Sequence, residues 1–187
     1  ALILGICAAT LGKKVDSAIS FAIDTVMGIP HILLLILISY AMGKGLKGVI
    51  AGVALTHWTS LARLIRGEVM QLRESEYIQI AGKLGLGKWE IAKKHIVPHV
   101  LPQFIVGLVL LFPHAILHES SITFLGFGLS TEQPAIGVIL SESMRYLIMG
   151  KWWLAVFPGM MLVLTVVLFE KGGTALRQLL DPGSVHK

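Results

Sequence analysis

The sequence predicts an all-α membrane protein built as a bundle of transmembrane helices, and three observations lead to this prediction. Of its 187 residues, 55% are hydrophobic and only 14% are charged, and the mean hydropathy is +0.77. A soluble domain is about 45–50% apolar and about 25% charged, so this composition excludes an ordinary soluble domain and a disordered chain. The apolar residues form long runs, and these runs lack the two-residue alternation of a membrane β-barrel.

Four apolar segments are long enough to cross a bilayer, which takes about 20 residues of helix. They are residues 23–42, 46–65, 100–117 and 154–169. Backbone groups in lipid must bond within their own segment, so each is expected to be a helix. The apolar run 1–11 is too short to span, and we expect it to be the end of a truncated first helix. Pro30, Pro113 and Pro158 are expected to be tolerated kinks.

The basic residues predict the orientation of these spans. The segment 63–98 carries Arg63, Arg66, Arg73, Lys83, Lys88, Lys93 and Lys94. Lys and Arg accumulate in cytoplasmic loops, so we place this segment and the C-terminus in the cytoplasm and residues 120–153 outside. The basic residues of the loops then account for the formal net charge of +5. We therefore expect contact with lipid and no nucleic-acid partner. We expect a single domain over 1–187 that includes both loops.

The loop 63–98 has the pattern of a helix, a glycine turn and a second helix. Ser75 or Glu74 can cap a helix over 76–84. Gly85 and Gly87 would end this helix, as a left-handed C′ residue does. A second helix is expected over 88–96, before Pro98.

The first helix of this loop carries a face of small apolar residues, because Ile78, Ala81 and Gly82 are spaced at i, i+3 and i+4. Such a face suits docking into a groove of a partner protein. The neighbouring lysines equally suit an amphipathic helix that lies on lipid headgroups. The physical pattern alone leaves both interpretations open.

Two sequence stretches of this loop carry a family resemblance. Glu76-Tyr-Ile-Gln-Ile-Ala-Gly-Lys-Leu-Gly85, followed by His95-Ile-Val-Pro98, resembles the EAA loop of binding-protein-dependent ABC transporter permeases. Further stretches resemble the peptide/nickel permeases in order and spacing from about Lys13 to Pro182. These stretches are Ala62-Arg-Leu-Ile-Arg-Gly-Glu68, Leu72-Arg-Glu-Ser-Glu-Tyr77, Phe124-Leu-Gly-Phe-Gly128, Leu176-Arg177 and Leu180-Asp-Pro182.

The resemblance implies the permease subunit of an ATP-driven importer in the plasma or inner membrane. In this family the EAA loop forms a coupling helix that fits a cleft in the ATPase subunit. The corresponding residues here are Glu76, Tyr77, Gln79, Ala81, Gly82, Gly85 and Gly87. The implied partners are two cytoplasmic ABC ATPase subunits, a second homologous permease and an extracytoplasmic substrate-binding protein. The chain itself would be no enzyme and would bind no cofactor, since ATP and Mg²⁺ belong to the ATPase subunits.

The sequence departs from the family pattern at two places. The Glu-Ala-Ala of the family falls on Gln79-Ile80-Ala81, so the acid is missing and one small residue is larger. The Leu before Pro98 is Val97, which is a mild change. We expect the docking geometry to survive, but no charge contact from Gln79.

No catalytic constellation is found in the sequence. His118-Glu119 begins a zinc-binding His-Glu-x-x-His motif, but Ile122 replaces its second histidine, and there is no P-loop. The alternative to an ABC permease is a secondary transporter or channel that works without an ATPase. Such a protein would be expected to carry acids inside its spans, and only Asp24 and Glu119 come close.

Four histidines lie in or at the ends of the predicted spans, where ionisable groups usually face a cavity. His31, His57, His114 and His118, with Glu119, are therefore candidates for the translocation path. His114 and His118 share a helix face and could bind a transition metal transiently, which would favour nickel over a peptide as cargo. The alternative is that these side chains bond only to backbone carbonyls or neighbouring helices, and the cargo stays open.

The outer segment 120–153 is rich in glycine, proline and apolar residues, with a short helix expected over 139–149. Irregular backbone at membrane depth must be buried in protein or line a cavity. The family resemblance implies that this segment faces the binding protein and shapes the gate. Trp152 and Trp153 are typical of an interfacial aromatic belt.

Overall fold

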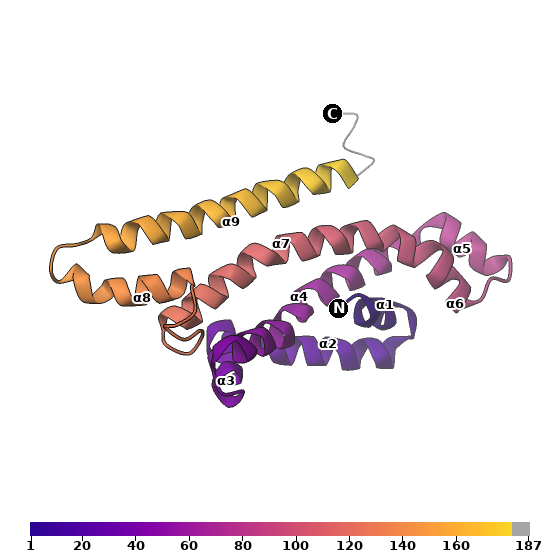
Figure 1. The fold of residues 1–187 in the computed structure, drawn as a ribbon. Coiled ribbons are helices and arrows are strands. Elements are labelled where there is room, and N and C mark those ends of the chain that lie inside the picture. Colours follow the sequence, from indigo (N-terminus) through magenta and orange to yellow (C-terminus); the bar gives the residue numbers. More distant parts are fainter. Residues whose placement is uncertain (181–187) are drawn as a thin grey trace. The chain divides into compact units, whose positions relative to one another are not determined.

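The computed structural model describes residues 1–180, with only the backbone of Lys88, and every regular element in this range is helical (Figure 1). The helices are α1 (Leu2–Thr10), α2 (Lys13–Gly28), α3 (His31–Ala41), α4 (Gly45–Glu74), α5 (Glu76–Lys83), α6 (Lys88–Ile91), the π-helical η1 (Ala92–Ile96), α7 (Val97–Phe124), α8 (Ile136–Leu147) and α9 (Trp153–Leu180). The all-α prediction is confirmed. The expected family stretch at 181–182 and the C-terminal end lie outside the described residues.

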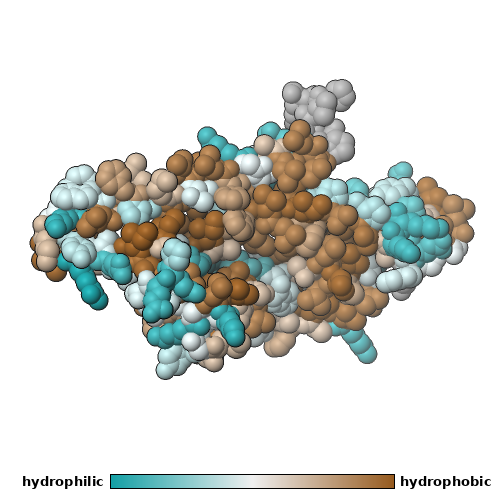
Figure 2. All heavy atoms as spheres, viewed as in Figure 1, coloured by the Kyte–Doolittle hydropathy of each residue, from teal (hydrophilic) through white to brown (hydrophobic). Residues whose placement is uncertain are grey.

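Within residues 1–180, three helical stretches are long and apolar enough to cross a membrane: α4, residues Trp89–Phe124 that contain α7, and α9. They contain the expected spans at 46–65, 100–117 and 154–169. None of the most apolar part of α9 is buried, and Figure 2 shows brown apolar side chains along it. Such a surface requires lipid or another helix around it. Pro113 and Pro158 lie inside α7 and α9, as expected of tolerated prolines.

The expectation of one continuous helix over 23–42 is wrong. The helix α2 ends at Gly28, and α3 begins at His31 with Pro30 as its N-cap. A proline has no backbone N–H and biases the preceding residue, here Ile29, away from the α region, so the helix stops before it. The spans therefore number three, or four if α2 and α3 together form one interrupted span.

The chain forms two compact units, which we describe separately. Among the described residues, unit 1 comprises 1–28, 58–108 and 176–180, and unit 2 comprises 29–57 and 109–175. One unit boundary lies between α2 and α3, and the other three fall inside α4, α7 and α9.

In unit 1, an apolar core joins α1, the second half of α4, α5, η1 and the start of α7. Its buried members are Ala9, Ile65, Val69, Leu72, Ile78, Ala92, Ile96 and Val100. The helix α1 lies very close to α4, since a Cβ on Gly5 would stand 2.8 Å from the Ala62 carbonyl oxygen. This core fixes the short helices of the loop to the ends of the two long ones.

The arginines of α4 make specific bonds within unit 1. Arg66 binds Asp16 of α2 with two hydrogen bonds, of which the Nη2–Oδ2 bond is 2.7 Å long. Arg63 pairs with Asp24 at 2.6 Å, and Arg73 donates to the backbone oxygen of Ala9 in the last turn of α1. The bidentate pair fixes orientation as well as charge. These arginines therefore attach α1 and α2 to α4.

In unit 2, α3 and α4 pack unusually closely through two glycines. A Cβ on Gly48 would lie 2.7 Å from the Ser39 backbone oxygen, and one on Gly52 would lie 3.1 Å from the Leu35 side chain. Glycines four residues apart let two helix backbones approach each other in membranes. Leu35 then packs with Val49 and with Ile122 of α7 in the core of unit 2.

Replacing Gly48 with alanine is expected to destabilise the protein by about 1–3 kcal/mol, because the new Cβ meets backbone that cannot rotate away. The matched control is Gly67→Ala in the same helix, where nothing lies within 4 Å of the new Cβ. Thermal unfolding in detergent should show a lower Tm for Gly48→Ala and an unchanged or higher Tm for Gly67→Ala. Equal Tm values for the two variants would contradict the close α3–α4 contact.

Candidate coupling surface and histidine cluster

The helix α5 is bounded by local backbone signals that the sequence predicts. At its C-terminal end Gly85 has φ +92°, the Leu86 N–H donates to the Ala81 oxygen, and the Gly85 N–H donates to the Gly82 oxygen. This is a Schellman ending, and it confirms the left-handed C′ role of Gly85. At the other end Ser75 holds the N-cap position, but its hydroxyl donates back to the Leu72 oxygen at 2.5 Å.

The structure corrects which face of α5 is available for docking. Ile78 and Ala81 are 6% and 8% exposed and belong to the buried face that packs on unit 1. The outward apolar residues are Tyr77, Ile80 and Leu84, which are 47%, 54% and 76% exposed. We call these three residues the coupling face. Two of the three residues of the predicted small face, Ile78 and Ala81, are used internally because α5 needs an apolar side to pack against its own core, whereas Gly82 is exposed.

The remaining coupling candidates surround this face. Glu76 is exposed in the first turn of α5, where a negative charge is favourable beside the helix N-terminus. Gln79 is exposed, and its Nε2 donates to the Glu74 backbone oxygen at 3.1 Å, which ties the start of α5 to the end of α4. Gly82 and Gly87 are exposed. Ile80, the residue that is larger than the family pattern, points outward and so adds to the coupling face without crowding the core.

The second loop helix is confirmed over 88–96, with its last turn widened into the π-helix η1. Ala92 and Ile96 of η1 are buried in the core of unit 1, and Trp89 is exposed. Short π-helical turns inside α-helices occur often at functional sites. From η1 the chain continues directly into α7, so α5 is bracketed by the ends of two long helices.

In unit 2, the loop after α7 is held to the turn between α3 and α4. The Ser39 hydroxyl donates to the Phe127 oxygen at 2.6 Å, and the Gly45 N–H donates to the Gly128 oxygen at 2.9 Å. Gly126 has φ +82° and closes α7 with a second Schellman ending. These bonds satisfy part of the irregular backbone within the protein, as a membrane setting demands.

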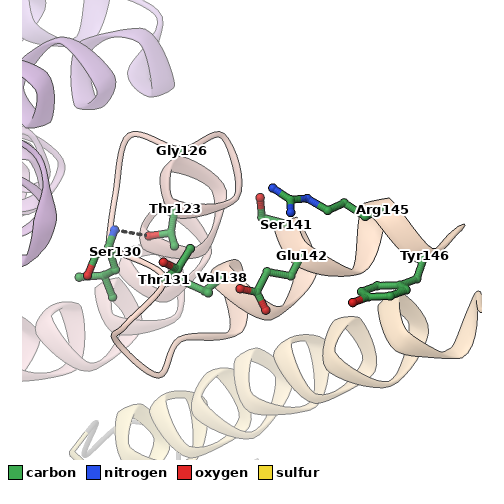
Figure 3. Close-up of a pocket in the computed structure, with 10 residues that line it drawn as sticks. Thr123, Gly126, Ser130, Thr131, Val138, Ser141, Glu142, Arg145 and Tyr146 are labelled. Carbon is green, nitrogen blue, oxygen red and sulfur yellow. Dashed lines mark hydrogen bonds between the residues drawn. The ribbon is translucent and has the colours of Figure 1, made fainter.

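The segment 120–153 also contributes to the lining of a cavity of about 760 Å³ (Figure 3). Glu142, Arg145 and Tyr146 come from α8, and Thr123 from the end of α7. The helix α8 begins three residues before the expected 139 and ends two before the expected 149. The cavity wall is polar and carries both charge signs.

Three of the candidate pathway histidines come together in unit 2. His31 begins α3, His57 lies in α4 and His118 in α7, and one ring nitrogen of each lies within 4.8 Å of the others. The ring centroids are 4.9 Å apart for His31–His57, 4.4 Å for His31–His118 and 5.3 Å for His57–His118. All three side chains are half-buried. We call these residues the histidine cluster.

The α3–α4 contact places two members of the cluster. The residue pairs Ser39–Gly48 and Leu35–Gly52 step four residues along each helix in opposite directions. Continuing this antiparallel register by one more step brings His31 to the level of residues 56–57. His118 lies one turn before Ile122, whose side chain packs on Leu35 and Val49. Both contacts therefore bring the imidazoles to one place.

Two other predicted pathway residues lie outside the cluster. His114 is on α7 one turn before His118 but is exposed and is not a member. Glu119 accepts hydrogen bonds from the Thr123 hydroxyl at 2.8 Å and the Ser120 hydroxyl at 3.3 Å on its own helix. The i, i+4 spacing predicts that His114 and His118 act together. In the structure, the partners of His118 are instead His31 of α3 and His57 of α4. The glycine spacing of α4 was the sequence signal that could have indicated this.

Comparison with known proteins adds a family match over nearly the whole chain. The model of the family described as binding-protein-dependent transport system inner membrane component matches residues 1–184. The dipeptide transport system permease protein DppC of Bacillus subtilis is 32% identical over 97% of this chain and 57% of its own length. DppC of Alkalihalophilus pseudofirmus is 36% identical over 96% of the chain and 59% of its own length.

A third relative is named for a metal cargo. The nickel transport system permease protein NikC of Escherichia coli is 31% identical over 97% of this chain and 65% of its own length. The chain therefore spans less than two thirds of the length of these curated relatives.

The two faces of α5 predict different tolerance to a leucine at neighbouring positions. Ala81→Leu is expected to lower the unfolding free energy by about 1–3 kcal/mol, because the buried site has no room for the larger side chain. Ile80→Leu, on the exposed face, should stay within about 0.5 kcal/mol of the parent protein. Thermal unfolding in detergent measures both. A stable Ala81→Leu variant would contradict the assignment of the inner face.

Proposed function

Because the chain belongs to the family of binding-protein-dependent transport system inner membrane components, we propose that it acts in the permease subunit of an ATP-driven importer. The single observation that carries this proposal is the coupling face, which presents Tyr77, Ile80 and Leu84 to solvent on a helix that is anchored by its buried residues Ile78 and Ala81. Large exposed apolar and aromatic side chains on an anchored helix are typical of a docking site. The proposed partner at this face is an ABC ATPase subunit.

The packing of α5 supports a mechanical role for this contact. Its inner residues Ile78 and Ala81 are buried, and the core around Ile78 contains Leu72 at the end of α4 and Ile96 and Val100 at the start of α7. A force applied to α5 therefore reaches two long helices through direct packing. We propose that closure of two ATPase subunits moves α5, and that this movement tilts the helices and opens the pathway alternately to each side.

The proposed assembly assigns the chemistry to several chains. Two cytoplasmic ATPase subunits bind ATP and Mg²⁺ and carry out hydrolysis, while this chain contributes only to the membrane path. A second, similar permease would complete the path, and an extracytoplasmic binding protein would deliver cargo. The relatives described above are named for dipeptide and nickel transport, so the cargo is a small solute: a peptide or a transition-metal ion.

We propose a location in the plasma or inner membrane, with the loop 63–98 and the C-terminus in the cytoplasm. The clustered basic residues of that loop support this orientation. It places the 760 Å³ cavity of the outer segment on the extracytoplasmic side, where a binding protein would release its cargo. The cavity residues Glu142 and Arg145 offer opposite charges to a polar solute.

Introducing an acid on the coupling face tests the ATPase contact. Ile80→Asp and Leu84→Asp in the full-length permease should weaken ATPase binding by about 2 kcal/mol or more, roughly thirty-fold, since each removes an apolar contact and buries a charge. The measurement is co-purification of the ATPase subunits from detergent, followed by cargo-stimulated ATP hydrolysis in lipid. The control is Ile148→Asp, an exposed apolar residue of the outer segment.

Wild-type ATPase recovery in both coupling-face variants would reject the assignment of α5. Cargo transport by vesicles that contain no ATPase would instead favour a secondary transporter or channel. A loss of recovery in Ile148→Asp as well would show that the effect is not specific to α5.

Site-specific labelling tests the proposed orientation. Leu84→Cys and Ile148→Cys, 76% and 94% exposed at the parent residues, are introduced separately after Cys7→Ser removes the cysteine of this chain. A membrane-impermeant maleimide should label Ile148→Cys in intact spheroplasts and Leu84→Cys only after permeabilisation. The opposite pattern would invert the topology.

A further inference from the structure

The histidine cluster is an uncommon feature for apolar helices. Its three members come from α3, α4 and α7, and α4 and α7 are among the helices long enough to span a membrane. Ionisable residues are costly inside a membrane protein and generally mark a substrate or ion pathway. Three imidazoles at one point are more than packing requires, since each could be replaced by an apolar side chain.

The hydrogen bonds of His57 leave one of its nitrogens available. Its Nδ1 lies 3.2 Å from the Val53 backbone oxygen, which can only accept, so Nδ1 carries the proton. The Thr56 hydroxyl, 3.0 Å away, donates to the Gly52 oxygen at 2.9 Å and can accept from the same N–H. The Nε2 of His57 therefore presents a lone pair. Metal-binding histidines have this arrangement, with the other ring N–H bonded to a carbonyl that fixes the ring.

Two ring nitrogens of the cluster are buried and lack a partner. The Nε2 atoms of His31 and His57 are both enclosed and make no hydrogen bond in the structure. Most buried polar atoms in proteins are hydrogen-bonded, so an orphaned pair in neighbouring rings calls for a ligand. A cation that accepts lone pairs satisfies both nitrogens at once.

We propose that His31, His57 and His118 together bind a divalent late-transition-metal ion as cargo during its passage through the membrane. This inference rests on the proposed permease function and names its substrate class. Imidazole is a preferred ligand of nickel, copper and zinc. Three neutral nitrogens leave coordination positions for water and add no negative charge. The site therefore binds the ion weakly enough to release it.

The spacing of the ligand nitrogens indicates that the three rings move closer together when an ion binds. Two neighbouring nitrogens bound to one metal lie about 3.0–3.4 Å apart, given metal–nitrogen bonds of about 2.1 Å and angles between 90° and the tetrahedral value. The ligand atoms of the cluster are separated by up to 4.8 Å, so the rings must draw together on binding. Because the ligands come from three different helices, small helix shifts change their spacing. Affinity is then coupled to the helix movements that transport requires.

The test measures metal binding directly, without relying on transport. The full-length permease is purified through a tag that contains no histidine, and Ni²⁺ binding is measured by equilibrium dialysis with radioactive nickel. The variants are His31→Gln, His57→Gln, His118→Gln and their triple combination. The matched control is His114→Gln, which changes an exposed histidine of α7 that lies outside the cluster. Melting temperatures report whether each variant folds.

We expect the parent protein to bind one more equivalent of Ni²⁺ than the triple variant, and each single variant to bind about tenfold or more weakly. His114→Gln should bind as the parent does. Equal stoichiometry and affinity in the parent and the triple variant would overturn the proposal. If the triple variant does not fold, X-ray absorption of the nickel-loaded parent decides, since fewer than two imidazole ligands on nickel also overturns it.

The outcome is separable from that of the proposed function. Loss of Ni²⁺ binding in the cluster variants, with ATPase co-purification retained, supports the metal site on a working permease. An unchanged Ni²⁺ affinity with ATPase binding intact rejects the metal site and leaves the permease in place. A parent protein that binds Ni²⁺ through the cluster but never associates with ATPase subunits rejects the importer assignment alone.

Discussion

The absence of water in a bilayer is the constraint on which the rest of this structure depends. A backbone group without a partner costs several kcal/mol in lipid, so the chain forms long helices and ties its irregular segments internally. The turn between α3 and α4 and the loop after α7 illustrate this, because each satisfies the other through Ser39–Phe127 and Gly45–Gly128. These bonds also hold α3, α4 and α7 together at one end of the packed region that contains the histidine cluster.

Close backbone packing then determines where polar side chains can meet. Gly48 and Gly52 allow α3 to approach α4 so closely that the antiparallel register continues to His31 and His57. A wider contact would move the two rings apart, because the distance between packed helices is set by the size of the side chains at the contact. The glycines are therefore part of the site although they contribute no functional group. In unit 1 the arginines of α4 play the corresponding role by fixing α1 and α2.

Most of the helices could be predicted from the sequence, because length and hydropathy determine membrane helices almost without regard to tertiary contacts. The end of α5 was also predictable, since Gly85 adopts a left-handed backbone conformation that residues other than glycine rarely adopt. At Pro30 the sequence predicts a kink within one helix, whereas the structure has two separate helices. Proline is tolerated within α7 and α9 but ends a helix at Pro30, and the local sequence does not say whether neighbouring groups will rescue the lost hydrogen bond.

The candidate sites were predicted less completely, because they depend on contacts between distant residues. Periodicity found an apolar face on α5 but could not show whether it packs inward or faces a partner, and Ile78 and Ala81 turned out to face inward. Spacing along one helix likewise paired His118 with His114, while the structure pairs it with His31 and His57. Local patterns identify residue types that can do chemistry, and tertiary packing selects which of them meet.

The two proposed sites make different demands on the same helices, and their differences fit one mechanism. The coupling face lies on a short helix with a well-packed inner side, so that a force from an ATPase is transmitted without being absorbed by local rearrangement. The histidine cluster is assembled from side chains on three helices with ligand nitrogens up to 4.8 Å apart, so that its ligand spacing responds to small shifts. A rigid tetrahedral site with four ligands would bind cargo tightly in every conformation and would oppose release. Three adjustable imidazoles bind only when the helices bring them together, which is the property that an alternating pathway needs at its centre.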